Sequence, residues 1–178
     1  TFETVEELYL TGLHLEQYRH PTIDPVPYWE AGLAMDPTDV RCNNAMGLVH
    51  LRRGDFNTAA EYFRTAIDKL TRRNPNPRDG EAFYNLGLTL KAMGRLDEAY
   101  GKLYKATWDF AWQTAAFYAL AEIDCRRRDF ETALDHLDRS LRTNAMNLKA
   151  RNLKAAALRH LGRLEEAAAV IEGTRTLD

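Results

Sequence analysis

Residues 83–103, FYNLGLTLKAMGRLDEAYGKL, contain the pattern that decides the fold. Apolar residues recur three and four positions apart in both halves of this stretch, as they do along one face of a helix. Gly94 lies between the two halves, where a glycine can end a helix in left-handed backbone. The small residues Gly87 and Ala99 would let two helices approach closely, and Leu103 would fill the groove beside them. We therefore predict two helices joined by a tight turn.

The same arrangement occurs in four copies, whose turns are spaced by 40, 34 and 34 residues. Because a single helix pair cannot bury its own apolar face, the copies are expected to stack. Arg128 stands where the other copies have glycine, so that turn should be strained or differently capped. The repeated places are the turns (Gly54, Gly94, Arg128, Gly162), small residues (Gly47, Gly87, Ala121, Ala155 and Ala59, Ala99, Ala133, Ala167) and large apolar residues (Phe63, Leu103, Leu137, Ile171).

These residues resemble the tetratricopeptide repeat, whose period is about 34 residues. Its signature is carried by Phe83-x2-Leu86-Gly87-x2-Leu90 and Ala99-x3-Leu103, and an irregular first copy matches at Leu8, Gly12, Leu15 and residues 29–37. The resemblance implies an all-α fold, a right-handed α-solenoid of about five helix-turn-helix repeats. We expect a single array over residues 1–178, with repeats at 5–39, 40–79, 80–113, 114–147 and 148–178.

A further likeness concerns residues 12–20 and 73–80, which are similar to the repeat tail of large bacterial proteins. In those proteins a domain of unknown function, suspected to be carbohydrate-associated, precedes the repeats. This likeness implies that the chain is a segment of a multidomain parent.

Three segments depart from the repeat. Three prolines within residues 18–27 predict a stiff, extended connection. Six extra residues lie within 71–80, and residues 107–112 contain Trp108 and Trp112 where Asp-Pro is usual. Insertions in solenoids fall on loops along one edge, often near the binding face.

Composition and motifs argue against several classes of function. The net charge is −2, which does not favour a nucleic-acid partner, and no apolar run is long enough to cross a membrane. The five histidines are scattered over several copies without i, i+4 pairs, and no phosphate-binding or nucleophile motif is present. We therefore predict no catalysis, no metal and no cofactor. Cys42 and Cys125 are expected to be free thiols, which favours a reducing, cytoplasmic location.

The family resemblance implies that the first helix of each repeat lines a concave groove. Carried over copy by copy, the ligand-facing places give a set that we call the groove residues: Tyr9, Arg41, Asn44, Arg52, Tyr84, Asn85, Lys91, Tyr118, Glu122, Arg126, Lys149, Asn152 and Arg159. Tyrosines offer rigid contact area, and asparagines can bind a peptide backbone or sugar hydroxyls.

Each of these features also has a structural interpretation. Cations in the last turn of a helix interact favourably with its dipole even without a ligand. The tyrosines, Trp108 and Trp112 can pack between repeats or contact a ligand. The carboxylate clamp of chaperone-binding relatives is incomplete, because no fifth-place residue is lysine.

Three hypotheses for the function follow. The leading one is a non-catalytic scaffold that holds a peptide, or another domain of the same or a different protein, in the groove. The second is an accessory module of a carbohydrate-active bacterial protein, suggested by the further likeness and by Trp108 and Trp112. The third is self-association into a homo-oligomer through an apolar face of the last repeat.

Overall fold

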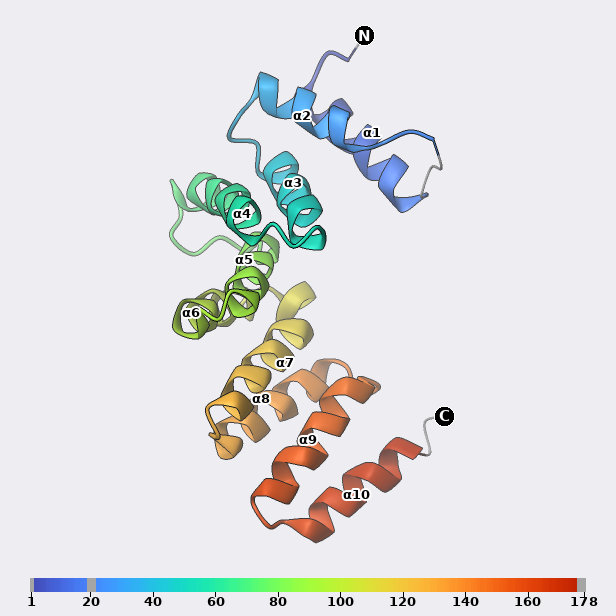
Figure 1. Cartoon of the computed structure of the whole chain (residues 1–178), viewed down its shortest axis with the longest axis vertical. Coiled ribbons are helices and arrows are strands. Elements are labelled where there is room, and N and C mark those ends of the chain that lie inside the picture. Colours follow the sequence, from blue (N-terminus) through green and yellow to red (C-terminus); the bar gives the residue numbers. More distant parts are fainter. Residues whose placement is uncertain (1, 19–21, 176–178) are drawn as a thin grey trace.

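The computed structural model describes residues 2–18 and 22–175, which form ten helices and no strand. Residues 19–21 of the proline-rich connection lie outside this part. The helices follow one another in a single curved stack (Figure 1). They are α1 (Val5–Gln17), α2 (Val26–Met35), α3 (Val40–Arg52), α4 (Phe56–Thr71), α5 (Glu81–Ala92), α6 (Leu96–Ala106), α7 (Phe110–Arg126), α8 (Phe130–Thr143), α9 (Leu148–His160) and α10 (Leu164–Arg175).

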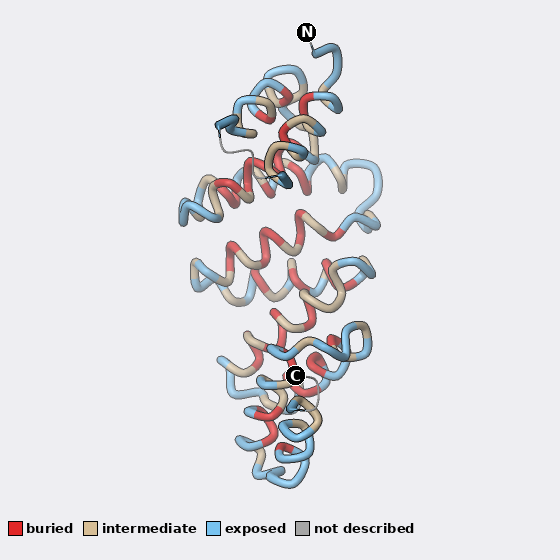
Figure 2. Tube along the Cα trace, turned by 90° about the vertical axis from the view of Figure 1, so that its right-hand side faces the viewer, coloured by how far each residue is buried: buried red, intermediate tan, exposed pale blue. Residues whose placement is uncertain are grey.

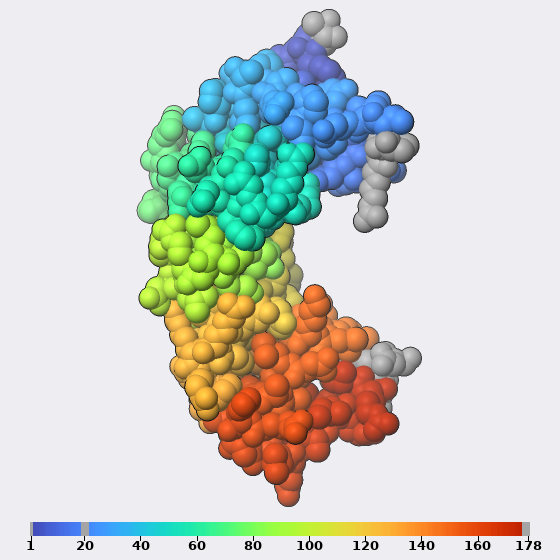
Figure 3. Space-filling view, in the orientation of Figure 1, coloured from blue at the N-terminus to red at the C-terminus, as the bar shows by residue number. Residues whose placement is uncertain are grey.

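The helices pack as five consecutive pairs, and each second helix also packs on the first helix of the next pair. First helices touch first helices as well, in the contacts α3–α5, α5–α7 and α7–α9, so they form one continuous layer. Figure 3 shows the stack curving around a hollow flank, and Figure 1 places α4 and α6 on the flank opposite to it. Buried residues run through the middle of the whole stack (Figure 2). The chain is therefore an all-α helical solenoid, as its sequence predicts.

Within a pair, a small residue on the first helix receives a large side chain from the second. A Cβ built on Gly47 would lie 2.5 Å from the Phe63 ring, and one on Gly87 would lie 2.6 Å from Leu103. Trp29 fills the same role against Gly12 in the first pair and is fully buried. The small and large places in the sequence are thus the contact points of each pair, and at Gly12, Gly47 and Gly87 the neighbouring side chain leaves no space for a Cβ.

The turns inside the pairs confirm the expectation for Arg128. Gly54, Gly94 and Gly162 have φ values of 78°, 77° and 75°, and Arg128 adopts the same left-handed backbone with φ 62°. A residue with a Cβ is strained in this conformation, so the turn at Arg128, inside the fourth pair, retains the shape of the others at an energetic cost.

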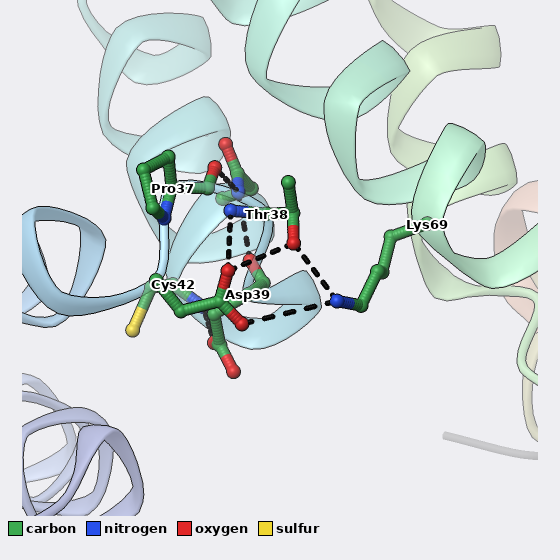
Figure 4. A network of polar contacts seen from close by, with 7 residues as sticks. Pro37, Thr38, Asp39, Cys42 and Lys69 are labelled. Carbon is green, nitrogen blue, oxygen red and sulfur yellow. Dashed lines mark hydrogen bonds and ion pairs between the residues drawn. The ribbon is translucent and has the colours of Figure 1, made fainter.

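The junctions between pairs are fixed by polar contacts. After α2, Asp36 accepts hydrogen bonds from the backbone and hydroxyl of Thr38, and the Lys69 ammonium donates to the Thr38 hydroxyl from the end of α4 (Figure 4). At the next long loop, the Gly80 N–H donates to Asp109, which also caps α7 at 3.0 Å from the Ala111 nitrogen. Because of this cap, α7 begins one turn before residue 114, where the repeat register places the fourth copy.

Candidate interaction surface

The groove residues lie on α1, α3, α5, α7 and α9, that is, on the layer of first helices. Their burial changes along the array. Asn44 and Asn85 are buried, and Tyr9, Tyr84, Lys91, Tyr118 and Glu122 are half-buried. The others are exposed: Arg41, Arg52, Arg126, Lys149, Asn152 and Arg159.

At the N-terminal end of the layer, the groove residues are engaged with α1. The Arg41 guanidinium lies 4.9 Å from the centre of the Tyr9 ring and pairs with the Glu6 carboxylate at 3.2 Å. Arg52 pairs with Glu16 at 2.6 Å. Burial raises the pKa of Tyr9, and the nearby carboxylate of Glu81 adds to this effect. Side chains from α1, α3 and α5 therefore meet here.

The two asparagines bind each other across the contact between α3 and α5. The Asn85 amide donates to the Asn44 carbonyl at 2.9 Å, and both side chains are buried. Glu81 also contacts Asn44, and burial is the main reason why the pKa of Glu81 is raised. This amide pair joins two repeats, so a ligand could reach it only after the repeats separate.

In the middle of the array, aromatic and charged groove residues join α5 to α7. Tyr84 stacks on Trp112 with ring centres 5.0 Å apart, and burial raises the pKa of Tyr84. The Lys91 ammonium forms an ion pair with Glu122, and both side chains are at least two-thirds buried. Burial also raises the pKa of Tyr118, whose hydroxyl contacts Glu122. Trp112 is thus a packing residue at this contact.

Trp108 behaves differently from Trp112. Its side chain is 59% exposed, and the Lys105 ammonium lies 4.1 Å from its ring centre. The structure does not pair the two tryptophan rings with each other in the residues that it describes.

At the C-terminal end, the groove residues Arg126, Lys149, Asn152 and Arg159 are exposed. Within the described part of the chain, none of these four side chains has an ion pair or a side-chain hydrogen bond. An open hollow of about 350 Å³ lies beside Ala156, Arg159 and His160. His160 itself stacks on Phe130 at 4.5 Å.

The sequence analysis missed one buried polar cluster. His136 lies 2.7 Å from the Asp124 carboxylate, and both side chains are almost fully buried between α7 and α8. Burial, with a contribution from Asp124, raises the pKa of Tyr100 to about 12. A signal for the cluster was present, because Asp124 occupies the repeat place of Leu90 and Leu158, where an apolar residue is expected.

Within residues 2–18 and 22–175, no group of three or more His, Cys, Asp or Glu side chains could hold a metal ion. No helix in that part of the chain combines the length and hydrophobicity needed to span a membrane.

Stacked helix pairs with polar side chains along one layer define a class of helical-repeat scaffolds. Within that class, the chain belongs to the tetratricopeptide repeat family, whose sequence model matches residues 44–113 and 118–177. Proteins of this family are generally non-catalytic scaffolds for protein interactions.

Several solved structures share the fold at low sequence identity. A structure of pilF from Pseudomonas aeruginosa has a TM-score of 0.83 and 20% identity, over 98% of this chain and 76% of that one. MamA from Desulfovibrio magneticus has a TM-score of 0.78 and 14% identity, over 99% and 96%. The structure of the APC/C hetero-tetramer Cut9–Hcn1 matches with a TM-score of 0.75 and 22% identity, over 87% of this chain and 30% of that one.

Proposed function

We propose that this chain is a non-catalytic interaction module that holds a peptide, or another protein domain, along its layer of first helices. One observation carries the proposal: polar and aromatic side chains occupy the same repeat places on the successive first helices α1, α3, α5, α7 and α9. These side chains lie on a single array that we place over residues 1–178. Solenoids use such extended concave surfaces for binding. The two cysteines of the chain, Cys42 and Cys125, are both free thiols, which supports a reducing location such as the cytoplasm.

A matched pair of tyrosines tests the position of the binding surface. Tyr118 lies on the first-helix layer and is half-buried, whereas Tyr104 lies on the second helix α6 and is 45% exposed. Peptides selected from a displayed library on the wild-type chain would be measured against both alanine variants. Tyr118→Ala should weaken binding about tenfold or more, as expected for an interface tyrosine. Tyr104→Ala should leave binding unchanged.

The result that contradicts the proposal is equally specific. If the selected peptides bind Tyr118→Ala as well as wild type but lose affinity for Tyr104→Ala, the second helices, which include α6, form the binding surface. Both variants must keep the wild-type helical circular dichroism for the comparison to hold.

A second candidate function is an accessory role in a carbohydrate-active bacterial protein. The observation that favours it is Trp108, since exposed aromatic rings can serve as platforms for sugar rings. Binding to a glycan array that disappears in Trp108→Ala, with Tyr104→Ala as the control, would support this role. Absence of glycan binding in the wild-type chain would remove it.

Self-association is the third candidate. On α10, Leu164 is 64% exposed and Ile171 is 43% exposed. Leu137, which occupies the repeat place of Ile171 in the preceding pair, is fully buried. Sedimentation equilibrium would detect dimers, and Ile171→Ser should dissociate them. A mass that stays monomeric at every concentration would exclude self-association.

A further inference from the structure

The cationic groove residues fall into two sets that occupy equivalent repeat places. Arg41, Arg52 and Lys91 each have a carboxylate partner on a neighbouring first helix: Glu6, Glu16 and Glu122, respectively. The second set occupies the same places in later copies, where Lys149 corresponds to Arg41, Arg126 to Arg52 and Arg159 to Lys91. Within the described part of the chain, these three make no ion pair.

The reason is a change at the partner places. Glu6, the partner of Arg41, lies on the preceding first helix, and the equivalent place before Lys149 is occupied by Ala115, which has no charge. Glu16 is the partner of Arg52, and the equivalent place before Arg126 is occupied by Lys91, which is itself a cation. Ala115 and Lys91 both lie inside the array. Two of the three cations therefore lack a partner because of residues within the repeats and not because they lie near the last helix pair.

Carboxylates on the same helices are turned elsewhere. On α7, Glu122 pairs with Lys91 and Asp124 is buried against His136. Helix α9 has no acidic residue, and Lys154, on its other side, pairs with Asp138 of α8. Among the residues that the structure describes, no carboxylate pairs with the exposed cations of α7 and α9, and this positive charge attracts an anionic partner.

We propose that Arg126, Lys149 and Arg159 bind an acidic, extended peptide segment of a partner protein. This inference rests on the proposed function and names the chemistry of the partner. Carboxylates of the peptide take the roles that Glu6, Glu16 and Glu122 have toward the equivalent cations. Charge-assisted hydrogen bonds of this kind are stronger than neutral ones.

The spacing of the exposed residues on α9 limits the peptide further. Lys149, Asn152, Ala156 and Arg159 are all exposed and recur at three or four residues, so they share one face of α9. Lys149 and Arg159 are ten residues apart, or roughly 15 Å along the helix. An extended peptide covers this distance in about four or five residues. Asn152, equivalent to Asn44, lies between them, where it can bond the peptide backbone, and Ala156 leaves room beside it.

Titrations with two short peptides test the partner chemistry. The first is a Gly/Ser decapeptide with Glu at positions 3 and 7, and the second has Gln at both positions. Two-dimensional NMR of the ¹⁵N-labelled chain detects even millimolar binding. We expect the Glu peptide to shift amide signals of α9 and the end of α7, with binding that weakens as salt is added. The Gln peptide should bind at least fivefold more weakly.

A substitution that adds a carboxylate provides the sharpest variant. Ala115→Glu restores, relative to Lys149, the carboxylate that Glu6 provides to Arg41. It should lower affinity for the Glu peptide at least threefold while leaving every cation in place, whereas Ala115→Gln, of equal size, should not. Because position 115 is half-buried, exposed substitutions provide an independent check. Lys149→Gln with Arg159→Gln should reduce affinity at least tenfold, and Arg64→Gln, an exposed cation on the second helix α4, should leave it unchanged.

Several outcomes would overturn the inference. These are equal binding of the Glu and Gln peptides, no effect of Ala115→Glu and of the double variant, or tighter binding of a ten-base-pair DNA duplex than of the Glu peptide. Dimers that Ala115→Glu abolishes would identify a second copy as the occupant instead. If the Glu peptide fails while library peptides still depend on Tyr118, only the acidic partner is wrong. If both fail, the proposed function falls as well.

Discussion

The two ends of the first-helix layer use the same residue types for different purposes. At the N-terminal end, Arg41 lies over Tyr9 and is paired with Glu6, so its charge is neutralised within the array. At the C-terminal end, Lys149 has the same place in its repeat and is exposed, with no carboxylate from the described residues beside it. The difference lies in the preceding first helix, where Glu6 of α1 has its counterpart in Ala115 of α7.

This contrast shows that the repeat place of a cation does not decide its role. Ion pairs between neighbouring first helices add to the contact between repeats, although each exposed pair contributes only up to about 1 kcal/mol. A cation without such a partner contributes little to folding and is free to meet an external anion. We therefore expect ion pairs to stabilise the contacts between repeats more in the N-terminal part of the array than in the C-terminal part.

The largest expected effect compares buried side chains in the two parts. Phe63 is fully buried against Gly47, whereas Ile171, at the equivalent place in the last pair, is 43% exposed. Phe63→Ala should lower the free energy of unfolding by about 3–5 kcal/mol, because it leaves a cavity in a packed core. Ile171→Ala should cost only about 1 kcal/mol. Urea denaturation followed by circular dichroism measures both.

Equal losses in these two variants would contradict the comparison, since they would mean that the last pair is as tightly packed as the second. Leu137→Ala, fully buried in the fourth pair, is the control and should resemble Phe63→Ala.

The next comparison concerns the paired and unpaired cations directly. Lys91→Gln removes the partner of the half-buried Glu122 and should cost about 1–2 kcal/mol, because the carboxylate then remains without a counter-charge. Arg159→Gln, at the equivalent place, should change the free energy of unfolding by less than about 0.5 kcal/mol. Thermal unfolding at low and high salt measures both. An equal loss in the two variants would mean that Arg159 has a stabilising partner after all.

The sequence was sufficient for the fold because the repeat places are local and redundant. The small and large residues that meet in each pair, such as Gly87 and Leu103, could be read from four copies in register, and so could the turn at Arg128. The repeat pattern alone also predicted that the groove residues lie on the first helix of each pair. Whether the groove residues contact a ligand stays a prediction.

The partners of those residues could not be read from one repeat place at a time. The bond between Asn85 and Asn44 and the ion pair between Lys91 and Glu122 depend on which rotamers meet across two helices. The stacking of Trp112 on Tyr84 depends in addition on the early start of α7, which the irregular segment 107–112 concealed.

A smaller effect separates backbone strain from surface charge at the end of α7. Arg128→Gly should relieve the left-handed strain and stabilise the chain by about 1 kcal/mol, or roughly 2–4 °C in melting temperature. Its control, Gly94→Ala, should destabilise by a similar amount. If the arginine at 128 serves only this turn, the affinity for the acidic peptide should be the same in Arg128→Gly and wild type. A large loss of affinity would add Arg128 to the cations that bind the peptide.

The last comparison concerns Asp124, the carboxylate of α7 that is buried away from α9, and its neighbour Tyr100. Burial, together with Asp124, raises the pKa of Tyr100 from 10.0 to about 12, so the folded chain favours the neutral phenol. The resulting stabilisation is complete below pH 10, where Tyr100 is neutral in both states, and is lost as the pH rises through 12. Tyr100→Phe cannot ionise and should therefore show a weaker loss of stability between pH 10 and 12 than wild type. The two proteins differ only at position 100, so the difference between their urea midpoints across this range isolates Tyr100. Parallel curves would mean that Tyr100 is solvated and that Asp124 is less buried than its contact with His136 indicates.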